Sequence, residues 1–140
     1  MDLPDFKPWA PWPQRASVAE AKRPGVYALA RFEDGPPSAV DLQSPEIIYF
    51  GETCNQPLTG RWSQFHRSAF KHADGHSGGL SFSASFMEDQ PGKVPDWLYV
   101  AACPIDLETP YRPAYIRFVE RWLIWEYVQR HARLPICNKI

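Results

Sequence analysis

The amino-acid sequence predicts an α+β fold with a small three-stranded antiparallel sheet flanked by helices. Three apolar stretches have the composition of strands, and two longer stretches repeat apolar residues at helical spacing. Their order along the chain is strand, strand, helix, strand and long helix, which is typical of antiparallel α+β folds. A length of 140 residues fits one domain spanning residues 1–140.

The expected strands are separated by clear loop signals. Residues Glu33 to Pro37 form a turn-rich loop, so the first two strands can pair as a hairpin with a long connection. A further segment, Ser81–Phe86, alternates aromatic or small residues with polar ones and is expected to be a short strand or an extended segment. The three main strands are expected at Val26–Phe32, Ile47–Phe50 and Leu98–Cys103.

Two helices are expected from apolar periodicity. The first runs from Leu58 to about Lys71, and the longest runs from Ala114 to about Arg133, before a proline. A short helix capped by Ser17 is expected nearer the N-terminus. Residues 1–16, rich in proline and aromatic residues, are expected to form an N-terminal extension that wraps over the surface and is pinned by its aromatic side chains.

Composition excludes several classes of protein. No apolar run approaches the roughly 18 residues of a membrane span, and the acidic, proline-interrupted N-terminus does not resemble a signal peptide. Three cysteines, Cys54, Cys103 and Cys137, contain no CxxC pair, which argues against a disulfide framework and a zinc ribbon. The sequence therefore predicts a cytoplasmic protein that does not contact membranes.

The formal net charge of −1 is a poor guide to partners, because the charges are unevenly distributed. Residues 111–140 are clearly basic, whereas residues 1–60 are net acidic. Such a basic region fits a polyanion, although solvated surface arginines give the same pattern. The basic residues of this region are Arg112, Arg117, Arg121, Arg130, Arg133 and Lys139.

Glu120 is the most informative single residue. At about 100° per residue, it falls inside the apolar arc of the long helix, between Tyr127 and Ile124. An unpaired buried carboxylate costs several kcal/mol, so this group is expected to be paired, protonated or bound to a cation. The alternatives are a salt bridge to a buried arginine, or a rotated helix that brings Glu120 to the rim.

Two tyrosines stand next to glycines in the expected hairpin, as Gly25-Val26-Tyr27 and Tyr49-Phe50-Gly51-Glu52-Thr53. By themselves, strand tyrosines are most often packing residues. Together with Arg61 on the first helix, Glu120 on the long helix and Asn138 after Leu134-Pro135, however, this set resembles the GIY-YIG nuclease superfamily. The resemblance runs in register from Gly25 to Asn138.

The resemblance implies a stand-alone, metal-dependent DNA endonuclease that leaves 3′-hydroxyl and 5′-phosphate ends. Glu120 would be the protein ligand of one Mg²⁺ or Mn²⁺ ion, and Arg61 would contact the scissile phosphate. Tyr27 or Tyr49 would activate the attacking water, and Asn138 would hold substrate or a catalytic side chain. The expected contacts to nucleic acid are Gly51, Thr53, Arg67 and Lys71.

The sequence departs from the family pattern at several points. The segment between the two tyrosines is longer than usual and resembles the hairpins of GIY-YIG restriction endonucleases. Members often place a histidine or tyrosine four residues after the arginine, where this chain has Phe65; His66 follows and is the expected proton shuttle. No DNA-binding domain is expected after Asn138, so specificity would come from this domain, a homodimer or a partner protein.

Other functions remain open from sequence. One is a GIY-YIG domain that has lost catalysis and binds nucleic acid or protein; another is a small-molecule hydrolase, which predicts a deep apolar pocket rather than an open basic groove. His72 and His76 have the i, i+4 spacing of a metal pair, but the intervening Gly75 and the absence of a matching cysteine argue against zinc.

Overall fold

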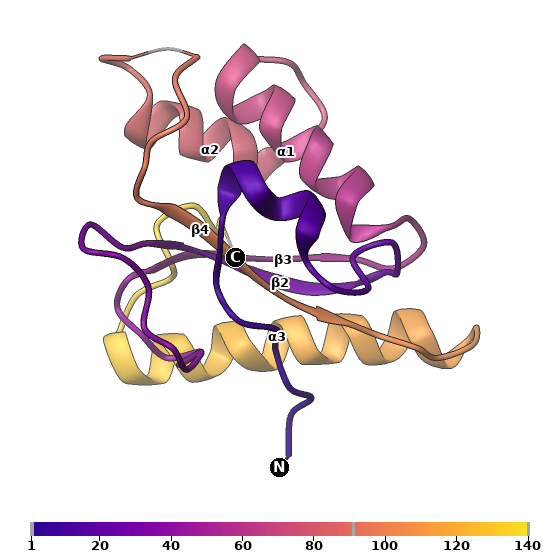
Figure 1. The fold of residues 1–140 in the computed structure, drawn as a ribbon. Coiled ribbons are helices and arrows are strands. Elements are labelled where there is room, and N and C mark those ends of the chain that lie inside the picture. Colours follow the sequence, from indigo (N-terminus) through magenta and orange to yellow (C-terminus); the bar gives the residue numbers. More distant parts are fainter. Residues whose placement is uncertain (1, 91, 140) are drawn as a thin grey trace.

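The computed structural model describes residues 2–90 and 92–139 and has three layers (Figure 1). A four-stranded antiparallel sheet lies in the middle, with α1 and α2 on one face and α3 on the other. The α+β class is therefore confirmed. The elements are β1 (Ala10–Pro11), a 3₁₀ helix (Trp12–Ser17), β2 (Gly25–Arg31), β3 (Ile47–Thr53), α1 (Leu58–Lys71), α2 (Ser77–Phe86), β4 (Leu98–Pro104) and α3 (Tyr111–His131).

The sheet has the strand order β1-β4-β2-β3. The expected hairpin of β2 and β3 is confirmed, with Tyr27 opposite Gly51 and Leu29 opposite Tyr49. The expectation of three strands was wrong, because a fourth strand, Ala10–Pro11, pairs with β4 on the side that does not contact β2. Proline lacks a backbone N–H, so such a strand is short and stays at the edge of the sheet.

Both faces of the sheet are covered, so its strands are apolar on both sides. Alternate residues of β2 face α3 on one side and the pair of helices α1 and α2 on the other. The N-terminal segment contributes to both cores: the Trp9 ring contacts Phe32 edge-on at 5.1 Å, and the fully buried Trp12 packs against Trp62 and Phe65. Its aromatic residues thus pin it, as expected.

Two local expectations were wrong. Ser81–Phe86 belongs to helix α2 rather than to a strand, because Phe82 and Phe86 are also spaced i, i+4 and their rings pack with centroids 5.1 Å apart. The short helix expected after Ser17 is instead a 3₁₀ turn that ends there, with Ser17 donating back to Gln14 rather than capping a new helix.

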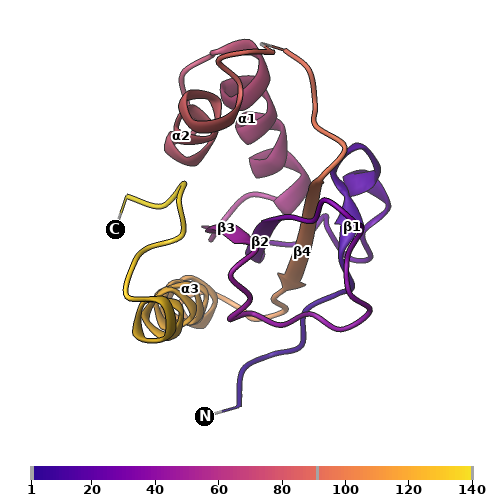
Figure 2. The same ribbon diagram turned by 90° about the vertical axis from the view of Figure 1, so that its left-hand side faces the viewer.

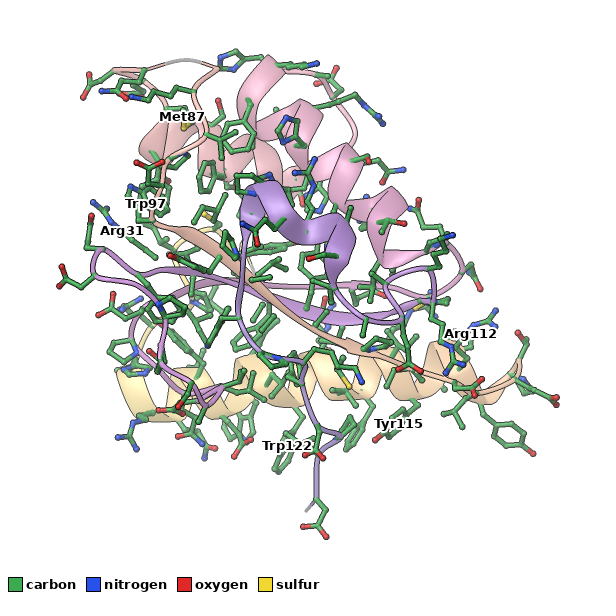
Figure 3. The ribbon with its side chains drawn as sticks, in the orientation of Figure 1. Arg31, Met87, Trp97, Arg112, Tyr115 and Trp122 are labelled. Atoms are coloured by element: carbon green, nitrogen blue, oxygen red, sulfur yellow. The ribbon has the colours of Figure 1, made fainter. Side chains whose placement is uncertain are left out.

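The outer face of α3 carries aromatic side chains. Tyr115 and Trp122 lie along the lower side of α3 in Figure 3 and are half-buried; Tyr115 packs against the core between α3 and the sheet, and the Trp122 ring stacks on Phe118 at 6.4 Å. Tyr111, Phe118 and Trp125 are exposed. In the described part of the chain, no helix is long and apolar enough to cross a bilayer.

Candidate active site

Most of the residues expected to carry chemistry gather near the edge of the sheet formed by β3. Seen along the sheet, the C-terminal segment passes this edge and links the α3 layer to the α2 layer (Figure 2). Two polar hollows adjoin there, of about 270 Å³ and 380 Å³, and Glu52 lines both. The smaller is lined by Tyr49, Phe50, Glu52, Ser77, Glu120, Arg121, Ile124, Cys137, Asn138 and Lys139. The larger is lined by Glu52, Thr53, Cys54, Asn55, Gln56, Arg61 and Arg117.

Tyr27 and Tyr49 share the face of the sheet that packs against α1 and α2, with ring centroids 6.0 Å apart. Gly51 makes this arrangement fit: a Cβ atom at this position would lie 2.5 Å from Cζ of Tyr27 and 2.6 Å from Cε2 of Tyr49. Gly78 of α2 approaches the Tyr49 ring in the same way. Tyr27 is completely buried, whereas Tyr49 is partly exposed in the smaller hollow.

Both phenols are protonated at neutral pH. Burial raises the pKa of Tyr49 to about 12, the Arg61 guanidinium acts to lower it, and Glu120 and Glu52 add to the rise. Burial also raises the pKa of Tyr27 well above its ordinary value, again with opposition from Arg61. A positive charge placed near the two carboxylates would therefore make both tyrosines more acidic.

His76 is a member of this cluster that sequence reasoning did not assign to it. Its Nε2 atom lies 2.8 Å from the Tyr27 hydroxyl oxygen, and its Nδ1 atom accepts a hydrogen bond from the backbone N–H of Gly79 at 3.1 Å. In the sequence, His76 stands between Gly75 and Gly78, beyond the expected end of the first helix at about Lys71. In the structure the residue instead caps the start of α2.

The largely buried side chain of Glu120 opens into the smaller hollow, so it reaches the rim of the apolar face of α3, one of the placements that the sequence left open, rather than pairing with a buried arginine. Its side chain is 17% exposed, and within the described part of the chain its ion-pair partner is the exposed Arg121, at 3.6 Å. Burial and the neighbouring Glu52 carboxylate raise the pKa of Glu120 to about 7, although Arg121 acts to lower it. The protein thus leaves this carboxylate under-compensated, which is the condition that favours binding of a proton or a cation.

Arg61 reaches the site from the first turn of α1. Its Nη1 atom donates to Oε1 of Gln64 at 2.7 Å and to the carbonyl of Gly75 at 3.3 Å. Within the described residues its Nε and Nη2 atoms have no hydrogen-bond partner, which leaves them for an anionic ligand. Arg112 of α3 donates to the carbonyl of Cys54, a residue that lines the larger hollow, at 2.9 Å and ties α3 to the loop after β3 (Figure 3).

Asn138 is held against β3 by two hydrogen bonds of its side-chain amide. Oδ1 accepts from the backbone N–H of Phe50 and Nδ2 donates to the Phe50 carbonyl, both at 2.9 Å. The N–H of Cys137 donates to the Ile48 carbonyl at 2.8 Å. The C-terminal segment therefore continues the sheet beyond β3 and closes one side of the smaller hollow.

We expect Asn138→Ala to lower the free energy of unfolding by about 2 kcal/mol, because both backbone groups of Phe50 lose their partner at the edge of the sheet. Hydrogen exchange should show faster exchange of the Phe50 amide, and urea unfolding should give the stability change. Lys139→Ala, at an exposed neighbouring side chain, is the control and should change neither quantity.

Several expected site residues do not join this cluster. His66 faces the N-terminal segment, where its Nδ1 accepts from the Trp12 indole N–H at 3.0 Å. Arg67 and Lys71 are exposed on α1 but line neither hollow. Thr53 lines the larger hollow, yet its hydroxyl donates to the Gln56 carbonyl at 2.9 Å and so stabilises the turn after β3.

The two histidines at i, i+4 spacing do not form a metal pair. His72 contacts the Ser83 hydroxyl at 3.0 Å, whereas His76 contacts Tyr27. Across residues 2–90 and 92–139, no three or more His, Cys, Asp or Glu side chains are grouped so that they could hold an ion together. Any ion at the β3 edge would therefore be held by one or two carboxylates and by water.

Comparison with protein-family models gave no match, and neither the curated proteins nor the solved structures contain a significant match to the chain.

Proposed function

We propose that this protein is a metal-dependent DNA endonuclease of the GIY-YIG type, which hydrolyses phosphodiester bonds to 3′-hydroxyl and 5′-phosphate ends. The observation that carries the proposal is the under-compensated carboxylate of Glu120, which shares a polar hollow with Tyr49 and Glu52. A purely structural carboxylate on the apolar face of a helix would have a buried cation as its partner, whereas among residues 2–90 and 92–139 the ion-pair partner of Glu120 is an exposed arginine.

The donor set fits a hard divalent cation. Mg²⁺ prefers oxygen ligands, keeps several waters and is typically held by one or two carboxylates, which Glu120 and Glu52 supply in the same hollow. A bound Mg²⁺ or Mn²⁺ ion supplies positive charge for the leaving 3′ oxygen and offsets the two carboxylates.

Arg61 is suited to bind the scissile phosphate. Its free guanidinium edge faces the larger hollow, which adjoins the carboxylates at Glu52. A planar guanidinium binds phosphate oxygens in a bidentate manner and stabilises the charge that develops on them. Arg117 and Arg121 of α3 line the two hollows and add positive charge along the path of a polyanion.

The difference in exposure gives the two tyrosines different roles. Tyr49 lines the hollow that Glu120 lines, so we assign to it the contact with the attacking water and the general-base step. Tyr27 is buried behind it and hydrogen-bonded to His76, so we assign it an orienting role. The field of Arg61 favours the phenolate of Tyr49, which a phenol needs in order to act as a base.

The polar lining of both hollows favours DNA over a small apolar substrate. A more apolar pocket of about 420 Å³ lies at the other end of β3, near Ile47, Phe86 and Leu134, and is not lined by Glu52 or Glu120. We keep the cytoplasm as the proposed compartment because all three cysteines are free thiols. We propose DNA as the partner and leave a second copy or a specificity protein as a hypothesis.

The test is cleavage of supercoiled plasmid with Mg²⁺ or Mn²⁺ by the wild type, Glu120→Gln and Tyr49→Phe, each with its folded fraction checked by circular dichroism. We expect the wild type to nick or linearise the plasmid, Tyr49→Phe to lose at least about 100-fold in rate, and Glu120→Gln to lose about 1000-fold or more. Glu126→Gln removes a charge from another face of α3, where Glu126 contacts Gln43, and should cleave like the wild type. An inert wild type on plasmid, single-stranded and branched DNA would favour a binding module that has lost catalysis.

A further inference from the structure

The Tyr27–His76 pair has one arrangement of protons that its surroundings allow. The backbone N–H of Gly79 can only donate, so Nδ1 of His76 must present its lone pair. A neutral imidazole with a free Nδ1 carries its proton on Nε2. That proton lies on the 2.8 Å line to the Tyr27 oxygen, so His76 donates and Tyr27 accepts.

The neighbours of His76 keep the ring neutral. The residue is 1% exposed, and no side chain of α2 is charged. From β2, β3 and α1 it meets Tyr27, Tyr49 and Phe65, with Arg61 close enough to act through its charge. Burial, with the Arg61 charge acting in the same direction, lowers the pKa of His76 to about 3.

A ring held in this way cannot act as a proton acceptor. Protonation would have to occur on Nδ1, which would break the cap of α2 and place a cation in a buried site next to Arg61. The same geometry is well suited to donation, because an N–H directed at a phenol oxygen stabilises negative charge on that oxygen. It also leaves the phenolic proton of Tyr27 free for a different acceptor.

We propose that His76 is a positioning residue that acts as a permanent hydrogen-bond donor to Tyr27, and that it is not a proton shuttle. The bond fixes the hydroxyl of Tyr27, directs its proton away from His76, and stabilises the oxygen when that proton is shared or lost. This role rests on the proposed nuclease function for its effect on rate. The hydrogen bond itself does not depend on that function.

Two substitutions separate the hydrogen bond of His76 to Tyr27 from its hydrogen bond to the backbone N–H of Gly79. In His76→Asn, the short amide retains an acceptor for the Gly79 N–H, and asparagine is a preferred residue at helix starts, but it does not reach Tyr27. In His76→Gln, the longer amide places an N–H near the former Nε2 atom and loses the cap geometry. We expect His76→Asn to reduce kcat for plasmid cleavage by about 10- to 100-fold, the range for losing a hydrogen bond to a charged group, with KM little changed. His76→Gln should keep most of the activity.

A third variant excludes a purely structural effect. In a Tyr27→Phe background, which has no hydroxyl to hold, adding His76→Asn should cause little further loss of kcat. An equal loss in both backgrounds, or full activity of His76→Asn combined with low activity of His76→Gln, would show that His76 serves only as a helix cap and would overturn the proposal.

Nitrogen NMR of the wild-type imidazole gives a readout that needs no catalysis. We expect a protonated Nε2 and a hydrogen-bonded, unprotonated Nδ1 from about pH 5 to pH 8, the interval in which an ordinary histidine changes charge. A ring that titrates in this interval, or a proton on Nδ1, would contradict the donor role. If the wild type cleaves no DNA, the nuclease proposal fails, and the NMR result alone decides whether His76 is the donor to Tyr27.

Discussion

Glu120→Gln should produce a protein that is more stable than the wild type at pH 8 and inactive as a nuclease. Glutamine has nearly the shape of glutamate and carries no charge, so it removes the cost of a half-buried anion beside Glu52. The same change removes the oxygen ligand proposed for the metal. The expected loss of cleavage rate is about 1000-fold or more, corresponding to several kcal/mol of transition-state stabilisation.

The gain in stability should depend on pH in a defined direction. The pKa of Glu120 is about 7 in the folded protein and near its ordinary value of 4.5 when unfolded. Below pH 4.5 the carboxyl is protonated in both states, so wild type and variant should be about equally stable. Between pH 4.5 and 7 the Glu120 carboxyl ionises in the unfolded state but stays protonated in the folded state. The free energy of unfolding of the wild type therefore falls by up to about 3 kcal/mol relative to that of the variant, and above pH 7 this difference stays constant.

Urea unfolding of both proteins at pH 4.5, 6 and 8 measures this difference. A gain that is the same at all three values would mean that the effect arises from packing rather than from charge. Mg²⁺ provides a second readout at pH 8, because a ligand that binds only the folded state raises its stability. The ion should raise the unfolding temperature of the wild type and of Glu126→Gln, and leave that of Glu120→Gln unchanged.

Gly51→Ala should destabilise the protein and reduce cleavage together. The added methyl group would lie 2.5 to 2.6 Å from atoms of both Tyr27 and Tyr49, closer than packed atoms approach, so the rings must move. Overpacking of this kind costs about 1 to 3 kcal/mol. Displacement of the Tyr49 hydroxyl by even a fraction of an ångström should lower kcat by about 10- to 100-fold.

Gly60→Ala is the matched control for stability. Gly60 lies in α1, and its nearest neighbour would be the flexible end of the Gln56 side chain at 3.2 Å. Alanine is favoured over glycine inside helices, so this variant should be as stable as the wild type or slightly more stable. Gly51→Ala is expected to behave differently only if Gly51 contacts nucleic acid, as the sequence motif implies. In that case the variant would have the free energy of unfolding of the wild type and weaker DNA binding, and the role of Gly51 in leaving room for the two tyrosine rings would be contradicted.

Much of the fold could be predicted because periodic burial leaves a direct pattern in the sequence. The bounds of α1 were predicted correctly, since Leu58, Trp62 and Phe65 fall on one helical stripe and are all completely buried. The hairpin was predicted from its β-rich strands and the turn residues between them. Glu120 was found in the same way, because a single polar residue stands out within an apolar arc.

α2 could not be predicted, because its sequence fits two periods. Phe82, Ala84 and Phe86 alternate as in a strand, while two glycines disfavour a helix. Contacts with distant residues decide the matter: a Cβ on Gly79 would lie 2.7 Å from Cβ of Ser68 on α1, and a Cβ on Gly78 would meet the Tyr49 ring. The glycines that weaken the helix locally are what allow it to pack closely there.

The sequence by itself determined the class of fold, the buried stripes of the helices, the hairpin of β2 and β3, and the unusual place of Glu120. All of these follow from patterns within one element or between neighbouring ones. Only the tertiary structure decided which histidine joins the tyrosines. His66 follows Phe65, the position on α1 where members of the family often have a histidine, but its ring points to Trp12. His76 instead contacts Tyr27, from which it is separated by 49 positions in the chain. A helix turned by one residue redirects a side chain by about 100°, and a contact between distant segments has no periodic trace in the sequence.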